Sequence, residues 1–162
     1  MNSFLSSKRP LLTVRNSIVV VSLLIALIGF ADATYLTIEH YQGVVPPCSL
    51  TGGCEVVLTS AYSTIAGIPV SLVGIANYLV LLIGFFAYLD SKNTTILKGT
   101  YLFSSLGFIS SIWFFYVQAA ILHAYCAYCL GSGVTSTLLF LIGVYVLYTS
   151  RAPRVEPTQP LS

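Results

Sequence analysis

Four long apolar stretches separated by short polar segments set the pattern of this chain. They cover about residues 17–38, 68–89, 100–122 and 130–149. Each is long enough to cross a bilayer, which takes about 20 mostly apolar residues in a helix. Because no water satisfies the backbone inside lipid, each span must be helical. The pattern therefore predicts an all-α membrane protein built as a bundle of four transmembrane helices.

Composition supports a membrane protein and excludes several other classes. The 162 residues are 56% hydrophobic and only 7% charged, whereas a soluble domain carries about 25% charged residues. Seven basic and five acidic residues cannot cover a soluble core of this size, and they form no basic stripe. An ordinary cytosolic globule, a disordered chain and a nucleic-acid binder are excluded. We expect one membrane domain over residues 16–150, with disordered cytoplasmic ends at 1–15 and 151–162.

The basic residues all fall on one side of such a bundle. Lysine and arginine mark the cytoplasmic side of membrane spans. Both termini are therefore predicted to be cytoplasmic. The loop at 39–67 and the link at 123–129 are predicted to lie on the periplasmic, extracellular or lumenal side. The basic residues are Lys8, Arg9, Arg15, Lys92, Lys98, Arg151 and Arg154.

Asp32 is the one charged residue inside the first predicted span. It lies roughly 10 Å from the outer end of that span, counting seven residues to Glu39 at about 1.5 Å each. An acid at this depth is costly and faces an interior or a water pocket. It either helps to deliver protons or hydrogen-bonds a neighbouring helix. Ala31-Asp-Ala33 also fits a signal-peptide cleavage site, but the apolar pattern continues to Ile38, which favours an uncleaved span.

The four cysteines all fall in the two outer segments. Cys48 and Cys54 lie in the loop after the first span, and Cys126 and Cys129 form a C-x-x-C pair just before the fourth. Disulfides persist in an oxidising compartment, so two structural bridges are one interpretation. A four-thiolate zinc site is a second, although only the later pair has the usual spacing. The third interpretation is a redox relay, which needs no metal.

A redox relay follows from the position of the second pair. A C-x-x-C pair that begins a helix is a known arrangement for reactive dithiols, because the helix amino terminus stabilises the thiolate. The loop pair, made mobile by Gly52 and Gly53, would pass electrons to it by thiol–disulfide exchange. Two electrons at the bilayer edge need an acceptor, and a lipid-soluble quinone is the natural one. His123 either stabilises a thiolate as a nearby cation or is a hydrated polar residue at the membrane interface without a catalytic role.

Several motifs occur in a defined order along the chain. They are Asp32-Ala-Thr-Tyr35-Leu-Thr37, Cys48-x5-Cys54, Ser60, Gly67-Ile-Pro69-Val-Ser-Leu-Val-Gly74 and Cys126-Ala-Tyr-Cys129-Leu. In this order and topology the chain resembles the vitamin K epoxide reductase family, particularly its prokaryotic quinone-linked members. The resemblance covers roughly residues 15–150. It implies a four-helix bundle around a quinone, capped by an outer loop with a short half-helix over about 55–65.

The resemblance also implies a role for each cysteine. Cys48 takes electrons from a partner dithiol, and Cys54 passes them to Cys126. Cys129 lies beside the quinone and attacks or reduces it. Ser60 matches a serine of the family's outer loop, although a hydroxyl that closes a helix turn is an equal alternative.

The quinone-binding positions depart from the animal vitamin K enzymes. Those hold the quinone with a polar residue in the second span and a tyrosine four residues after the second active-site cysteine. Val70 and Gly133 occupy these positions here. The departures favour a simple quinone, such as ubiquinone or menaquinone, over vitamin K epoxide. Trp113 and Phe114 in the third span are further candidates to line a pocket for the flat ring.

The sequence thus predicts an integral membrane thiol:quinone oxidoreductase of a prokaryotic cell membrane. It would oxidise a thioredoxin-like dithiol protein on the outer side, reduce a membrane quinone and support disulfide formation in exported proteins. Family members often carry a fused thioredoxin-like domain, and the end at Ser162 implies a separate partner. Two rivals remain, namely a vitamin K epoxide or quinone reductase and a non-enzymatic scaffold with structural disulfides.

Overall fold

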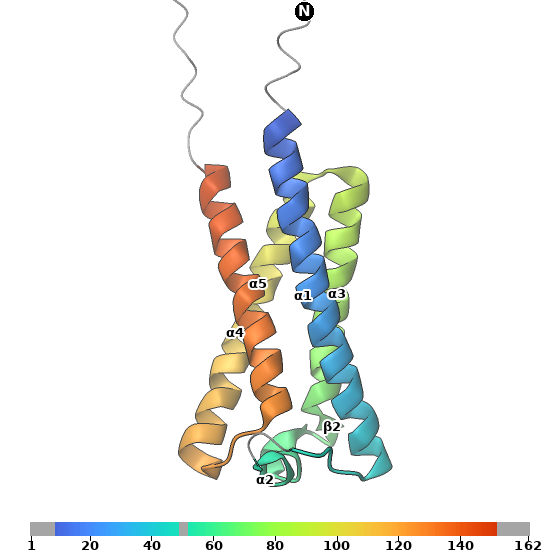
Figure 1. The fold of residues 1–162 in the computed structure, drawn as a ribbon, viewed down its shortest axis with the longest axis vertical. Coiled ribbons are helices and arrows are strands. Elements are labelled where there is room, and N and C mark those ends of the chain that lie inside the picture. Colours follow the sequence, from blue (N-terminus) through green and yellow to red (C-terminus); the bar gives the residue numbers. More distant parts are fainter. Residues whose placement is uncertain (1–8, 49–51, 152–162) are drawn as a thin grey trace, which may run out of the picture.

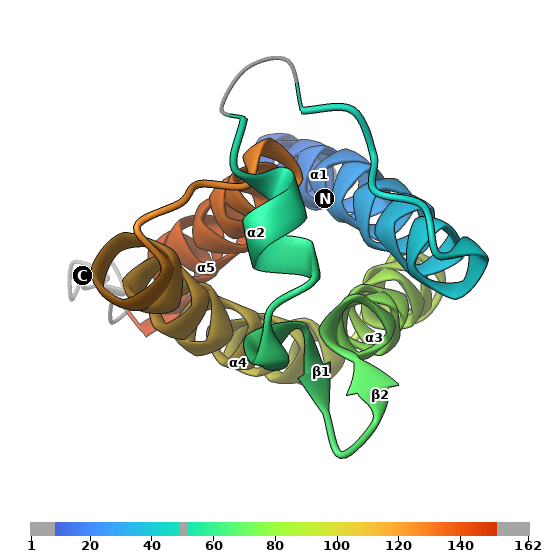
Figure 2. The ribbon, with the colours of Figure 1, turned by 90° about the horizontal axis from the view of Figure 1, so that it is seen from below.

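The computed structural model describes residues 9–48 and 52–151, which form an elongated bundle of long helices (Figure 1). The helices are α1 (Arg9–Gln42), α3 (Val70–Ser91), α4 (Thr94–Tyr116) and α5 (Ala127–Arg151). Within the described chain these four are long and apolar enough to cross a membrane. α1 and α4 each pack against α3 and α5, so the four surround a common axis (Figure 2). The predicted four-helix membrane bundle is confirmed.

The helix ends lie close to the predicted ends of the spans. α1 begins at Arg9, earlier than expected, and residues 1–8 and 152–162, most of the predicted disordered ends, lie outside the described residues. Lys92 closes α3 with a φ of 54°, and the Asn93 side chain accepts a hydrogen bond from the Thr95 N–H at 2.9 Å. Asparagine is a favoured helix N-cap, so this polar pair turns the chain directly from α3 into α4.

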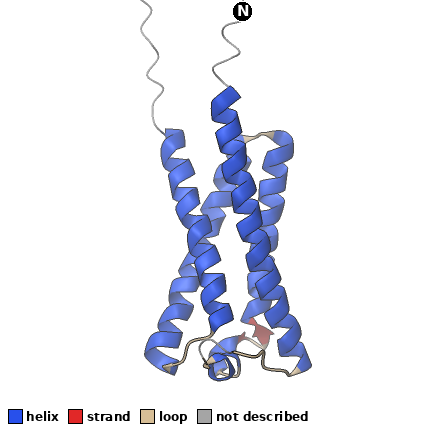
Figure 3. Cartoon of the chain, in the orientation of Figure 1, coloured by secondary structure: helices blue, strands red, loops and turns tan. Residues whose placement is uncertain are grey.

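A small cap covers the end of the bundle opposite the termini. It contains α2 (Cys54–Leu58), the 3₁₀ turn η1 (Ala61–Ser63) and an antiparallel hairpin of β1 (Thr64–Ile65) and β2 (Ile68–Pro69) (Figure 3). The half-helix expected over 55–65 is present but ends at Leu58. Its end has a local cause, because the Thr59 and Ser60 hydroxyls donate to the carbonyls of Glu55 and Val57. Such side-chain bonds compete with helix continuation.

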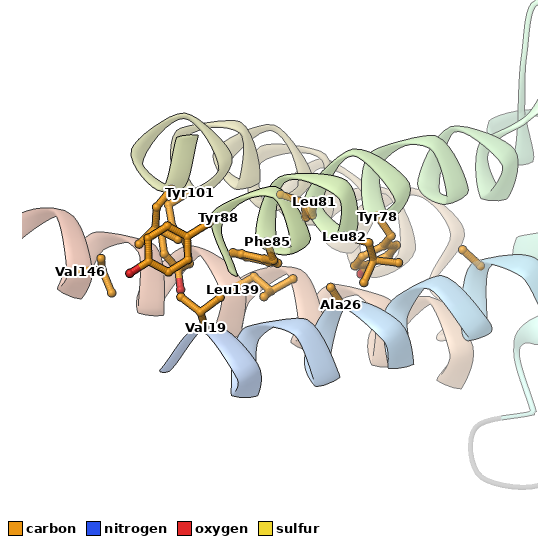
Figure 4. Packing of buried hydrophobic residues seen from close by; sticks show 12 residues of the cluster. Val19, Ala26, Tyr78, Leu81, Leu82, Phe85, Tyr88, Tyr101, Leu139 and Val146 are labelled. Atoms are coloured by element: carbon orange, nitrogen blue, oxygen red, sulfur yellow. The ribbon is translucent and has the colours of Figure 1, made fainter. Parts of the chain in front are cut away.

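The hydrophobic core fills the half of the bundle nearer the termini (Figure 4). Its largest members are aromatic, namely Tyr78, Phe85 and Tyr88 of α3 and Tyr101 of α4. Tyr101 is buried there, with its hydroxyl 2.9 Å from the Ser22 hydroxyl of α1. Phe85 packs edge-on against Tyr101 at 5.3 Å between ring centroids. This packing joins the helices at one end and leaves the other end to be closed by the cap.

Tyr78 marks the boundary of that core. Its ring is 1% exposed, and a Cβ at Gly29 would overlap it, so the glycine lets α1 and α3 approach closely. Its hydroxyl lies 2.7 Å from the Thr135 hydroxyl and 3.0 Å from the Ser136 hydroxyl on α5. Beyond this contact, toward the cap, the helices separate around a cavity.

Candidate functional site

A cavity of about 1430 Å³ occupies the half of the bundle beneath the cap. All four long helices and the cap contribute to its wall. Ligand pockets in proteins usually measure about 300–1,000 Å³, so this one has room for a ring and part of an attached chain. The wall is mostly apolar, and it contains one cysteine, Cys129. The space therefore suits a lipid-soluble molecule that reacts with a thiol.

The structure brings all four cysteines together at the capped end. Cys48 and Cys54 form a disulfide, with Cα atoms 5.8 Å apart, and Cys126 and Cys129 are free thiols. Cys54 and Cys126 are fully buried in one cluster, and Cys48 and Cys129 pack against that cluster. Both predicted pairs are therefore neighbours, even though about 70 residues of chain separate them. This is the geometry that exchange between the pairs requires.

Gly53 is the reason that the cap can approach the C-x-x-C pair. A Cβ at Gly53 would lie 2.7 Å from the backbone nitrogen of Tyr125 and 2.8 Å from its backbone oxygen. Real side chains do not tolerate such contacts, so only glycine allows the two backbones to meet here. Gly52 has a φ of +65°, which glycine adopts at little cost. The two glycines therefore have different roles, and at Gly53 it is close contact rather than mobility.

Cys126 occupies the N-cap position of α5. The N–H of Cys129, at the third helical position, donates to the Cys126 sulfur at 3.4 Å. The side chain of Cys129 also hydrogen-bonds to it and is the main reason that the pKa of Cys126 falls to about 7. Burial and the charge of Asp32 act in the opposite direction, and the backbone N–H groups of Cys129 and Tyr128 assist the lowering. Cys126 is thus poised to be a thiolate, the nucleophilic form.

Gln118 holds the backbone of Cys126, a role that the sequence analysis missed. Its Oε1 accepts the Cys126 N–H at 2.8 Å, and its side chain is only 2% exposed. In a capping box the third helical residue accepts this N–H, but Cys129 occupies that position here. Gln118 replaces it from η2 (Val117–Leu122), a π-helical turn that follows α4. A lone glutamine eight residues before Cys126 in an apolar span was the available signal.

Three auxiliary candidates from the sequence have different surroundings. Asp32 lines the cavity, and its buried Oδ2 has no hydrogen-bond partner among the described residues. Ser60 also lines the cavity, while its hydroxyl donates to the Val57 carbonyl at 2.7 Å and so closes the turn after α2. His123 is exposed, has a φ of 47°, and is not among the groups that lower the pKa of Cys126. Only Asp32 and Ser60 face the cavity.

The predicted quinone-lining residues are divided in the same way. Val70, Gly133 and Phe114 line the cavity. Trp113 does not, since its side chain is 53% exposed and its ring lies 6.0 Å from that of Tyr116. Trp113 therefore faces away from the cavity, while its neighbour Phe114 faces into it. Phe114 is the aromatic residue of that pair placed to meet a ligand.

The Cys126 thiolate should form near neutral pH. With the loop disulfide intact, the ultraviolet absorbance of the thiolate should rise with a midpoint near pH 7. Below that pH the thiol is protonated and the nucleophile is lost. Cys129→Ala removes the main stabilising hydrogen bond and should move the midpoint toward the ordinary cysteine pKa of about 8.5. His123→Ala should leave it in place, and a shift in that variant alone would contradict the assignment.

The buried cysteine cluster predicts a specific cross-link. Replacing both Cys48 and Cys129 by alanine leaves Cys54 and Cys126 as the remaining thiols. Because these two lie in one cluster, mild oxidation should join them in an intramolecular disulfide. Mass spectrometry of the digested protein measures the yield. Absence of the bond would show that the cap and the C-x-x-C pair do not meet.

Adding Gly53→Val to that double variant should reduce the yield of the cross-link several-fold. The new side chain would collide with the Tyr125 backbone and push Cys54 away from its partner. Gly131→Ala is the matched control, because nothing lies within 4 Å of a Cβ at that position. An equal yield in both variants would mean that close backbone approach at Gly53 is not what sets the contact.

The family model described as the vitamin K epoxide reductase family matches residues 20–144. The match includes all four cysteines, the cap and most of each long helix. No curated protein matches the chain. Four membrane-spanning helices, a disulfide-bonded cysteine pair and a C-x-x-C pair agree with this match. The chain therefore belongs to the vitamin K epoxide reductase family, whose members are membrane oxidoreductases that act on thiols and quinones.

Proposed function

We propose that this protein oxidises a thioredoxin-like dithiol protein, reduces a membrane quinone and so supports disulfide formation in exported proteins. The position of Cys129 is the observation that carries the proposal. Its side chain reaches the wall of a large apolar cavity, while its C-x-x-C partner Cys126 is buried against Cys54 of the cap. One end of the cysteine chain thus meets the lipid-soluble reactant, and the other end lies in the cap.

The order of the cysteines follows from their burial. Cys48 is partly exposed and Cys54 is fully buried, so Cys48 is the sulfur that a partner's thiolate can attack. That attack forms a mixed disulfide at Cys48 and releases the Cys54 thiol. The partner's second thiolate then attacks this bond, so the partner leaves as a disulfide and its two electrons and two protons remain on Cys48 and Cys54. Cys54 then attacks an oxidised Cys126–Cys129 pair, and this exchange regenerates the loop disulfide.

Oxidation of Cys126 and Cys129, the inner pair, completes the balance of electrons and protons. Cys126 and Cys129 lose two electrons and two protons and form a disulfide, and the quinone gains both and becomes a quinol. The structure contains the loop disulfide and the two inner thiols. This combination corresponds to the stage at which the inner pair is loaded with electrons and the cap is ready for the next partner. The lowered pKa of Cys126 favours the thiolate that closes the Cys126–Cys129 disulfide as the quinone accepts the electrons.

Cys129→Ala should abolish quinone reduction with every electron donor. A single remaining thiol in the C-x-x-C pair cannot form the intramolecular disulfide that releases two electrons. The loss of quinone absorbance in detergent or proteoliposomes measures the rate. Faster turnover of vitamin K epoxide than of menaquinone by the unmodified protein would contradict the proposed substrate, as would a cysteine-independent rate.

Cys48→Ala should act differently and serves as the matched variant. It removes the sulfur that meets the partner, so reduction driven by a thioredoxin-like protein should fall strongly. Dithiothreitol is small enough to reduce the inner pair directly, and its reaction should persist. Equal losses with both donors in the Cys48 and Cys129 variants would refute this division of labour.

We also propose that the cysteines face the periplasmic or extracellular side of a prokaryotic cell membrane, with both termini in the cytoplasm. Lys92 and Lys98 lie at the end of the bundle opposite the cap, in the turn between α3 and α4 and the start of α4 (Figure 1). Arg9 and Arg15 belong to the first turns of α1 and Arg151 ends α5, at that same end of the bundle, whereas Lys8 and Arg154 lie outside the described residues. Basic flanks stay in the cytoplasm, so the cap lies outside.

Thiol labelling in intact cells should establish the orientation. A variant that keeps Cys48 as its single cysteine should react with a membrane-impermeant maleimide added outside the cells. Lys92→Cys in a background without other cysteines should react only after the cells are permeabilised. Labelling of the position-92 variant from outside, or failure of Cys48 to react until lysis, would reverse the proposed orientation.

A further inference from the structure

Asn77 is an amide within the membrane-spanning part of the bundle that faces the cavity. It lies on α3 and is half-buried, and it belongs to the cavity wall. In the described part of the chain, its side chain makes no hydrogen bond with any other group. An amide without a partner at this depth is costly, because lipid offers it nothing in place of water. The side chain is therefore placed to bind something that enters the cavity.

Several neighbouring polar groups of the wall already have partners. The Ser111 hydroxyl donates to the Gly107 carbonyl at 2.8 Å, and the Thr137 hydroxyl donates to the Gly133 carbonyl at 2.7 Å. The Ser132 and Ser136 hydroxyls lie 3.2 and 3.0 Å from the Tyr78 hydroxyl, and Gln118 holds the Cys126 N–H. Asn77 differs from this group, because both of its N–H donors remain available.

The amide packs closely against α4 at Gly107. A Cβ at Gly107 on α4 would lie 3.0 Å from Asn77 Nδ2 and 3.4 Å from the Ser136 hydroxyl oxygen. Gly107 and Ser136 therefore lie next to Asn77, and the missing side chain at position 107 makes room for the amide between the helices. Gly107, Ser136 and Asn77 all line the cavity. This cluster is the polar floor of the cavity.

The floor lies at a defined depth below the thiols. Asn77 is seven residues along α3 from Val70, and Ser136 is seven residues along α5 from Cys129, so each pair is about 10 Å apart along its helix. α3 and α5 both start at the capped end, so Asn77 and Ser136 lie at similar depths (Figure 1). A ring that stands along the bundle axis can meet Cys129 with one end and Asn77 with the other.

We propose that the Asn77 amide donates the hydrogen bond that holds one carbonyl of a para-quinone, with the other carbonyl directed toward Cys129. The inference rests on the proposed function and deepens it by naming the ligand of the ring. Val70 and Gly133 offer no side-chain donor. When the ring takes two electrons, its oxygens gain negative charge before both protons arrive, and the amide hydrogen bond strengthens. Asn77 thus aids binding and, more strongly, reduction.

Two variants test the donor. Asn77→Leu removes the amide at similar volume and should lower kcat/KM for menadione roughly tenfold with dithiothreitol as the electron donor, the size expected for one hydrogen bond. Asn77→Gln keeps an amide and should recover part of the loss. The titration midpoint of the Cys126 thiolate should not change in either variant, because neither alters α5 or Gln118.

Direct binding supplies a readout that does not need turnover. Trp113 is the single tryptophan and sits beside Phe114 of the cavity wall, so a bound quinone should quench its fluorescence. Asn77→Leu should shift the menadione quenching midpoint to severalfold higher concentration. Asn16→Leu is the matched control, since it makes the same change on α1 away from the cavity wall, and it should leave the midpoint unchanged.

The outcomes separate this inference from the proposed function. An Asn77→Leu protein with normal quenching and normal kcat/KM overturns the quinone contact, and a lowered melting temperature alone would mean that the amide only joins helices. The proposed function fails separately if the unmodified protein, with its inner thiols reduced, neither binds nor reduces menadione or a short-chain ubiquinone. If the unmodified protein reduces menadione and the Asn77→Leu variant is unaffected, the inference about Asn77 is wrong and the proposed function is retained.

Discussion

The requirement that every backbone polar group be satisfied inside lipid determines the plan of this molecule. Helices meet this requirement within themselves, so the four spans are regular over most of their length. Irregular backbone gathers at the capped end, in α2, η1, the short hairpin and the link before α5. The proposed thiol exchange needs turns, helix caps and contact between loops, and the cysteines lie at this same end. The cysteines lie at the cap because that is where the chain can bend.

Two contacts hold the two cysteine pairs next to each other at the capped end. Gly53 lets the backbone of the cap touch the backbone of Tyr125, which brings Cys54 next to Cys126. Gln118 accepts the N–H of Cys126 and so fixes the start of α5 from the preceding helix. With this backbone held, the Cys126 sulfur receives the Cys129 N–H and the thiolate is stabilised. Alignment of the two cysteine pairs thus depends on one missing side chain and one buried amide.

The sequence alone predicted whatever depends on local pattern and charge placement. The four spans follow from apolar length, and the C-x-x-C pair at the start of α5 follows from spacing. It could not give the partners of particular side chains. Trp113 and Phe114 were indistinguishable as apolar neighbours, and only the rotation of α4 shows that Phe114 faces the cavity. Gln118 acts through a π-helical turn that no hydrophobic period reveals. The half-helix stops early because hydroxyl–carbonyl hydrogen bonds interrupt it. Whether these bonds or further helical backbone bonds form depends on the surrounding fold.

The proton balance of the proposed reaction indicates which proton transfer Asp32 could carry out. Oxidation of the Cys126–Cys129 dithiol releases two protons, and reduction of a quinone to a quinol takes up two. The two balance only if the proton that Cys126 gives up when its thiolate forms also reaches the quinone. Asp32 lines the cavity, has a carboxylate oxygen without a partner among the described residues, and its charge raises the pKa of Cys126. That arrangement suits a group that passes a thiol's proton to a quinone oxygen and returns to its first state.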